Sequence, residues 1–341
     1  MDINQCINLY RTKYIVQKNW QSGNAVAYMF DCVTPAVVTC LQMDEEKVVA
    51  CFDDKTVLMW DLYGNLKQSF VGHVGGVWCM QYIGNVLSTG STDRTIRIWD
   101  LQTGECSKWL VGHSSTVRCL QMSEDARLVV SGSRDTTDIE TGECLHVLMG
   151  HQASVRCLAI KDNYIVSGSY DNSCRVWDIC SGELKFHLEG HVSKVYSLCV
   201  DNRYIYSGSL DSTINVWSLA DGTQIKAIRD HRSLVALLKK NEYNQLISAS
   251  ADGSVKVWDE DLNQLYSLDH NTSAITCLFS KGPWLITGSD KSVKLWKNGT
   301  FCRNIMDNVD SVWQVAATET CLINAVHING HSCFRIYHFD K

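Results

Sequence analysis

A Gly-His phrase recurs along the chain with a period of about 40 residues, the length typical of four-stranded units that form a ring around a channel. This repeat constrains the fold more than any other feature. The histidine is followed by a Ser-Gly-Ser-x-Asp turn or a close variant and, in most copies, by a strand ending in Val-Trp-Asp or a close variant. The histidines are almost evenly spaced, at His73, His113, His151, His191, His231 and His270. The repeat therefore predicts a β-propeller.

A tryptophan ends the third strand of each unit, shortly after the turn aspartate or its equivalent. These tryptophans are Trp60, Trp99, Trp177, Trp217, Trp258 and Trp296, and the corresponding turn residues are Asp54, Asp93, Asp171, Asp211, Asp252 and Asp290. The interval from Trp99 to Trp177 spans two periods, so one tryptophan is missing rather than one repeat. This pattern identifies the units as WD repeats.

The repeat without a tryptophan has lost part of its sequence. The stretch Ser133-Arg134-Asp135-Thr136-Thr137 runs directly into Asp138-Ile139-Glu140-Thr141-Gly142, where neighbouring repeats place a strand such as Ile96–Trp99. About four residues are missing, which would shorten a strand and expose the hydrogen-bonding groups beside it.

The two ends of the chain complete the expected architecture. A degenerate last repeat runs from about Val309 to Phe339 and contains Trp313, and Ala25 to Phe30 is expected to supply its outer strand. We predict an all-β fold, a WD-repeat β-propeller of eight blades in which one blade lacks part of a strand. The predicted domains are an N-terminal linker remnant at 1–24 and the propeller at 25–341.

Composition excludes several classes of protein. The net charge of −6 argues against nucleic-acid binding. The 16 cysteines include no Cys-x-x-Cys pair, and many share one apolar strand phase, as expected of buried thiols in a reducing compartment. There is no apolar run long enough to cross a membrane, no signal peptide and no lipidation motif. We therefore expect a soluble protein of the nucleus and/or cytoplasm, with no membrane contact and no cofactor.

The repeated His, Ser and Asp residues invite comparison with a catalytic triad. The set recurs in five or more units, however, and a nucleophile does not need five copies. Hydrogen bonds across each turn, with the indole N–H included, would satisfy buried polar groups. One histidine per blade also cannot converge on a single metal ion. We therefore predict no catalytic and no metal-binding residues among them.

Specificity is expected where equivalent positions differ between repeats. The fifth residue after the histidine is, in successive repeats, Trp78, Arg118, Arg156, Tyr196 and Ala236. The residue before the turn aspartate is Thr92, Arg134, Tyr170, Leu210 and Ala251, and Arg94 follows a turn aspartate. Clustered arginines on an acidic protein favour bidentate contact with phosphate or carboxylate. The residues thus predict a binder of phosphopeptides or acidic motifs; the alternative is that the arginines pair with Asp or Glu of neighbouring loops.

Several of these motifs occur together, in order, in one known family. They are Gly-Gly-Val-Trp78, Gly-Ser-Thr-Asp-Arg94, Ser-Ser-Thr-Val-Arg118-Cys, Ser-Gly-Ser-Arg134-Asp, Ser-Val-Arg156-Cys and Gly-Ser-Tyr170-Asp. The chain resembles, over roughly residues 10 to 341, the phosphodegron-reading F-box/WD-repeat proteins of the archipelago type, which are substrate receptors of SCF ubiquitin ligases. The stretch Tyr10 to Trp20 is similar to that family's linker between F-box and propeller.

The resemblance implies a site for phosphothreonine followed by proline. Arg118, Arg134 and Arg156 would hold the phosphate with Tyr170 assisting, and Trp78 would pack on the proline. The groove would be lined by three further residues, Arg94, Ser115 and Thr116. Phosphorylated protein substrates would be bound in this way for SCF-type ubiquitination and proteasomal degradation, and the chain itself would be a non-catalytic receptor.

The sequence departs from this family in three places. No F-box is expected, because the stretch 1–24 is too short to hold that helical domain; the Skp/cullin ligase core is thus a partner only if an F-box exists upstream. Gln314 stands where the family usually has an arginine for a second phosphate, which predicts weaker dependence on doubly phosphorylated motifs. The missing strand directly follows Arg134. An F-box-less scaffold that binds unphosphorylated partners and a decoy that shields phosphorylated ones remain alternatives.

Overall fold

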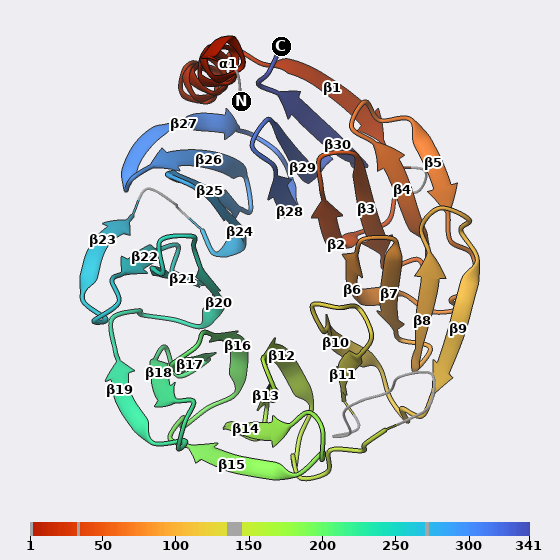
Figure 1. Ribbon diagram of the computed structural model, residues 1–341, viewed down its shortest axis with the longest axis vertical. Coiled ribbons are helices and arrows are strands. Elements are labelled where there is room, and N and C mark those ends of the chain that lie inside the picture. Colours follow the sequence, from red (N-terminus) through yellow and green to blue (C-terminus); the bar gives the residue numbers. More distant parts are fainter. Residues whose placement is uncertain (1–2, 33–34, 135–144, 270–272) are drawn as a thin grey trace.

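The computed structural model describes residues 3–32, 35–134, 145–269 and 273–341. His270 and the segment 135–144, which includes the place where the repeat is shortened, lie outside the described residues. The described chain is a ring of antiparallel sheets with one N-terminal helix at its rim (Figure 1). This arrangement confirms the all-β propeller predicted from the repeats. No described helix combines the length and the apolar character needed to cross a membrane.

Seven sheets of the described chain are four-stranded blades. The first two are β2 (Val38–Met43), β3 (Lys47–Phe52), β4 (Val57–Asp61) and β5 (Leu66–Ser69), then β6 (Val77–Ile83), β7 (Val86–Ser91), β8 (Thr95–Asp100) and β9 (Cys106–Val111). The next two are β12 (Val155–Lys161), β13 (Tyr164–Ser169), β14 (Ser173–Asp178) and β15 (Leu184–Glu189), then β16 (Val195–Val200), β17 (Tyr204–Ser209), β18 (Ile214–Ser218) and β19 (Gln224–Ile228).

The other three blades complete the circuit. They are β20 (Val235–Lys240), β21 (Leu246–Ser250), β22 (Val255–Trp258) and β23 (Gln264–Leu268); β24 (Ile275–Lys281), β25 (Trp284–Ser289), β26 (Ser292–Lys297) and β27 (Thr300–Met306); and β28 (Ser311–Ala317), β29 (Cys321–Ile328) and β30 (His331–His338) with β1 (Val26–Asp31). The first strand of each blade is the innermost and the last is the outermost, except that β1 is the outer strand of the closing blade (Figure 1).

The prediction of eight blades is wrong, because the described residues form seven four-stranded blades. The repeat between β9 and β12 contributes only a two-stranded sheet to the described chain, β10 (Val117–Met122) paired with β11 (Val129–Ser133). The reason lies in the length of the chain that follows. The stretch from Ser133 to the buried Leu148 is four positions shorter than the equivalent stretch from Ser169 to the buried Leu188. This repeat therefore has four fewer residues than its neighbour in which to form further strands.

The last blade is closed by the N-terminal part of the chain, as predicted for Ala25 to Phe30. Strand β1 pairs antiparallel with β30, with Val26 opposite His338 and Asp31 opposite Cys333. The two ends of the propeller therefore share one sheet, and pairing covers an edge that would otherwise stay exposed.

Helix α1 (Ile3–Ser22) precedes β1 and lies against the closing blade (Figure 1). The Trp20 indole stacks on Phe339 with ring centroids 4.0 Å apart, and its Nε1 donates to the Glu319 carbonyl at 2.9 Å. Asn19 donates to the Phe339 carbonyl at 2.8 Å. The helix is thus held to the propeller through its C-terminal turns.

The repeated polar residues form a buried network inside the blades. In the blade β12–β15, Ser167 Oγ accepts a hydrogen bond from Trp177 Nε1 at 2.9 Å and lies 2.8 Å from His151 Nε2. His151 Nδ1 lies 2.7 Å from a carboxylate oxygen of Asp171. The contact from histidine Nε2 to a hydroxyl recurs at His73, His191 and His231. These groups satisfy one another within the four blades that contain these histidines, which supports their predicted structural role.

Candidate functional site

Each innermost strand carries a one-residue β-bulge near its start. In β10 the ladder passes from Val117 directly to Cys119, which leaves Arg118 without a Cα partner on β11. The residues in this bulge position around the ring are Thr39, Trp78, Arg118, Arg156, Tyr196, Ala236, Thr276 and Trp313. A bulge re-aims the side chain that it releases from the ladder. The first of the two specificity positions predicted from the sequence is therefore a position that every blade frees for contacts.

The second predicted position is held next to the bulge by a backbone hydrogen bond. The N–H of Arg134 donates to the carbonyl of Thr116 at 3.2 Å, and that of Tyr170 donates to Ser154 at 3.0 Å. Thr92 makes the equivalent bond to Gly76 at 2.9 Å. Since the acceptor lies two positions before the bulge, both specificity positions occupy the same end of each sheet.

Five of the eight predicted site residues line one cavity of about 320 Å³. The lining consists of Trp78, Thr92, Thr116, Arg118, Arg134, Ser154 and Tyr170. These side chains come from β6–β9, from β10–β11 and from β12–β15, three consecutive sheets of the ring, or from the turns beside them. Bulge and turn residues of successive repeats thus converge on a single recess.

The other three predicted residues lie outside that lining. Arg156 is half-buried in the bulge of β12, and its charge acts on Arg118. Ser115 is half-buried one position before Thr116. Arg94 is exposed in a turn with φ of 73°, a left-handed conformation that Asn172 and Ser212 share at the equivalent place. The structure therefore brings the predicted Arg156 close to the cavity through its neighbour Arg118, and leaves Arg94 and Ser115 outside the lining.

The cavity concentrates positive charge. Burial lowers the pKa of Arg118, and the nearby charges of Arg156 and Arg134 lower it further. The guanidinium stays protonated at neutral pH, so its charge is held against burial first and against repulsion by the two other arginines second, and a bound anion would offset both. Within the described ranges, none of Arg94, Arg118, Arg134 and Arg156 forms an ion pair with a carboxylate. Pairing with loop acids, the alternative reading of these arginines, is not seen in this part of the chain.

Aromatic rings flank the cations. The Arg118 guanidinium lies 4.3 Å from the Trp78 ring centroid, and that of Arg156 lies 5.9 Å from the Tyr196 ring. Tyr170 packs against Tyr196 with centroids 5.1 Å apart. Burial, together with a hydrogen bond to Tyr196, raises the pKa of Tyr170, so its hydroxyl stays protonated and can donate.

Three residues of this region were not among the predicted site residues. Thr92 and Ser154 line the cavity with hydroxyls, and the ammonium group of the exposed Lys194 lies 5.0 Å from the Tyr170 ring centroid. Ser154 and Lys194 occupy the same repeat position as the predicted Thr116, two positions before a bulge. Comparing that position around the ring would have found both of them.

The chain is similar in sequence to a known family of repeats and to two proteins of yeasts. The profile of the family described as WD domain, G-beta repeat, matches residues 64–100, 104–137, 142–178, 182–218, 222–259 and 262–297. The chain is 31% identical over 395 residues to cell division control protein 4 of Saccharomyces cerevisiae, a match that covers 98% of this chain and 49% of that protein. It is 37% identical over 360 residues to cell division control protein 4 of Candida albicans, covering 92% and 53%.

The fold also matches solved structures. The crystal structure of the computationally designed Ika8 protein superposes with a TM-score of 0.82 at 30% identity, and the match covers 89% of this chain and 97% of that one. Against the curated relatives, by contrast, the chain spans only about half of their length.

Proposed function

The chain belongs to the WD-repeat family, and from that premise we propose that it is a receptor for phosphothreonine-proline segments of other proteins. The observation that carries this proposal is the recess formed by Arg118 and Arg134, with Arg156 at its edge and no carboxylate paired to any of the three among the described residues. Phosphate carries roughly 1.5 to 2 negative charges at neutral pH, so it offsets this repulsion better than a single carboxylate does.

The chemistry of the lining favours one arrangement of the bound segment. The arginines would hold the phosphate oxygens through charge-assisted hydrogen bonds, each contributing roughly 1.5–3 kcal/mol. Tyr170 would donate a further hydrogen bond from its protonated hydroxyl. Trp78 would offer its indole as an apolar wall for the proline that follows the phosphothreonine.

Receptor activity for a ubiquitin ligase is the wider part of the proposal. It is supported by the motif resemblance to SCF substrate receptors and by similarity along nearly the whole chain to two proteins named for the control of cell division. In that role the propeller catalyses nothing; it holds a substrate lysine near a ubiquitin-conjugating enzyme, which raises the effective concentration of the two reactants. The Skp/cullin core of the ligase would be a partner only if an F-box exists upstream.

Fluorescence polarisation with labelled peptides tests the proposal. A peptide containing phosphothreonine-proline is titrated with the protein and compared with its unphosphorylated twin and with a phosphomimetic glutamate twin. We expect saturable binding of the phosphopeptide and at least about 100-fold weaker binding of both twins, because two or more charge-assisted bonds are lost. Equal affinity for all three peptides would refute phosphate recognition and favour a scaffold that reads unmodified segments.

A further inference from the structure

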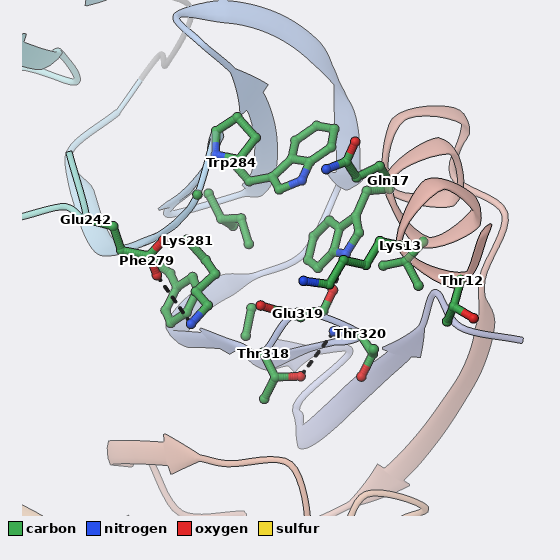
Figure 2. A pocket seen from close by; sticks show the side chains of 16 residues that line it. Thr12, Lys13, Gln17, Glu242, Phe279, Lys281, Trp284, Thr318, Glu319 and Thr320 are labelled. Carbon is green, nitrogen blue, oxygen red and sulfur yellow. Dashed lines mark hydrogen bonds and ion pairs between the residues drawn. The ribbon is translucent and has the colours of Figure 1, made fainter. Parts of the chain in front are cut away.

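A second cavity lies on the opposite side of the ring from the arginines, where α1 meets the last two blades. Its volume is about 280 Å³. Figure 2 shows Lys13 and Gln17 of α1 on one side and Glu242, Phe279 and Lys281 on the other. None of its lining residues belongs to the recess proposed for phosphate, so the two sites can be tested separately.

The walls of this cavity are apolar and largely aromatic. Trp20 and Trp284 stack with centroids 5.9 Å apart, and both residues are almost fully buried, at 3% and 8% exposed. Phe279 and the buried Val16, Ile286 and Ala317 complete the apolar lining. An engineered apolar cavity of roughly 150 Å³ is large enough for benzene. The present cavity is therefore large enough for one aromatic side chain.

The charges around the mouth are unequal. Lys13 and Lys281 line the cavity, and Lys297 lies 5.0 Å from the Trp284 ring centroid; Glu242 and Glu319 are the carboxylates. Lys281 is paired with Glu242 at 3.3 Å, whereas Lys13 has no ion pair within the described residues. Lys239 also lies 4.9 Å from the Phe279 ring centroid, so ammonium groups outnumber carboxylates around the cavity, and Lys13 is the lining cation left without an ion pair among the described residues. One carboxylate on a ligand would complement it, and Glu319 would repel a second.

We propose that this cavity is a docking site for a partner peptide in which an aromatic side chain stands next to a single acidic residue. The ring fills the space between Trp20, Trp284 and Phe279, and the neighbouring carboxylate pairs with Lys13. Pockets of this kind, apolar with a few placed polar groups, are the usual form of a peptide-anchor site. Because α1 forms one wall, the bound peptide also fastens the helix to the propeller.

The probes are three short peptides titrated into the whole chain: Ac-Asp-Trp-Gly-NH₂, Ac-Asn-Trp-Gly-NH₂ and Ac-Asp-Ala-Gly-NH₂. Binding is followed by the ¹⁵N–¹H resonance of the Trp20 indole, whose N–H donates to the Glu319 carbonyl at the cavity wall. We expect the first peptide to shift this resonance saturably and the alanine peptide to leave it unchanged. The asparagine peptide should bind about three- to fivefold more weakly, as for the loss of an exposed ion pair.

Two variants and a control connect the binding to the cavity. Ala317→Leu fills the space and should abolish binding, and Lys13→Gln should reduce the affinity for the aspartate peptide to that for the asparagine peptide. Lys18→Gln, a change at an exposed lysine of α1 outside the lining, should have no effect. No saturable shift with the first peptide, an equal shift with the alanine peptide, or equal binding to wild type and Lys13→Gln would overturn the proposal. Lys13→Gln alters only an exposed side chain and keeps the test valid if Ala317→Leu unfolds.

Discussion

The guanidinium of Arg118 lies over the indole of Trp78, 4.3 Å from the ring centroid, although the two residues belong to neighbouring sheets of the ring. Both occupy bulge positions, so their backbones leave the ladder at equivalent points. The contact occupies one side of the guanidinium and leaves N–H groups available. Arg118 is thereby oriented before any ligand arrives, which reduces the entropy lost on binding.

Replacing Arg118 is expected to remove most of the affinity for the phosphopeptide. Arg118→Ala should weaken binding by roughly 10- to 100-fold, since it removes one charge-assisted contact of roughly 1.5–3 kcal/mol, while the thermal unfolding midpoint stays close to that of wild type. Fluorescence polarisation and thermal unfolding measure the two effects. Arg127→Ala, a change at an exposed arginine elsewhere in the same repeat, is the matched control and should leave the affinity unchanged. Undiminished binding by Arg118→Ala would exclude this arginine from the phosphate site.

Trp78 is expected to determine the preference for proline. Trp78→Ala should weaken binding of a phosphothreonine-proline peptide about tenfold through lost packing and a less ordered Arg118. It should also remove the difference between that peptide and a phosphothreonine-alanine peptide. Four titrations, two proteins against two peptides, measure the coupling between the indole and the proline. If the variant still prefers proline by the wild-type factor, the proline binds elsewhere.

The polar networks of complete and incomplete repeats should differ in their contribution to stability. Ser167 contacts both His151 and Trp177, whereas Ser131 of β11 contacts His113 and has no tryptophan partner, because the chain has no tryptophan between Trp109 and Trp177. Ser167→Ala leaves two buried groups without a partner and Ser131→Ala leaves one. Each such group costs about 1–3 kcal/mol. Ser167→Ala should therefore lower the free energy of unfolding by about that much more than Ser131→Ala, as measured by urea denaturation; equal losses would contradict this account.

The sequence predicts those parts of the fold and of the site that depend on residues repeated in each unit. In the complete units the histidine, the hydroxyl residue, the aspartate and the tryptophan bond to one another within one blade, so their spacing alone predicts the architecture. The predicted number of blades was wrong because a strand pattern does not reveal whether a shortened repeat still has enough chain for four strands. Arg118, Arg134 and Tyr170 could be found because equivalent positions of a ring converge in space. Thr92 and Ser154 occupy equivalent positions too, but a small hydroxyl group at such a position does not by itself indicate a ligand, so neither is predicted as a site residue.

The position of the N-terminal helix, by contrast, could not be predicted from the sequence. The stretch 1–24 contains no repeat, and its predicted role as a linker remnant included no contact with the propeller. The structure packs Trp20 of α1 on Phe339, at the other end of the chain. Contacts between a unique segment and a repeat are set by tertiary packing, and the cavity beneath α1 follows from them. The repeat pattern of the sequence therefore predicts neither the packing of α1 nor the cavity.

Acid should destabilise the propeller in two stages. Burial lowers the pKa of His191 against the opposing effect of Asp211, so the unfolded chain takes up a proton near pH 6.5 before the folded chain does. Stability is therefore complete above about pH 6.5 and falls as the pH decreases below it. The pKa of Asp211 is also lowered, because hydrogen bonds from Thr213 and the neighbouring His191 outweigh its burial; this adds a second loss below about pH 4. Urea denaturation at several pH values between about 5 and 7.5 gives the free energy of unfolding as a function of pH. This free energy should change less steeply with pH in His191→Gln than in wild type or in His187→Gln, a change at a more exposed histidine.

The last prediction concerns a second phosphate. Gln314 follows the bulge residue Trp313, and its Nε2 donates to the Thr39 carbonyl at 3.3 Å; Thr39 Oγ1 in turn donates to the Val77 carbonyl beside Trp78. Gln314 is thus connected to the indole end of the recess, where the chain beyond the proline would pass. An amide offers a phosphate no positive charge, so we expect a second phosphate on that side to raise the affinity of the wild-type protein less than about threefold.

Gln314→Arg should change this selectivity while leaving the first phosphate site intact. The added guanidinium should strengthen binding of a doubly phosphorylated peptide by about fivefold to tenfold and leave the singly phosphorylated peptide unaffected, because only the former has an anion within reach. Gln314→Lys is the control for charge without a bidentate edge and should give a smaller gain. The gain should also shrink as salt is raised, since it rests on an exposed charge. Strong preference of the wild-type protein for the doubly phosphorylated peptide would mean that another cation, such as Lys194 at the far end of the recess, already serves the second phosphate.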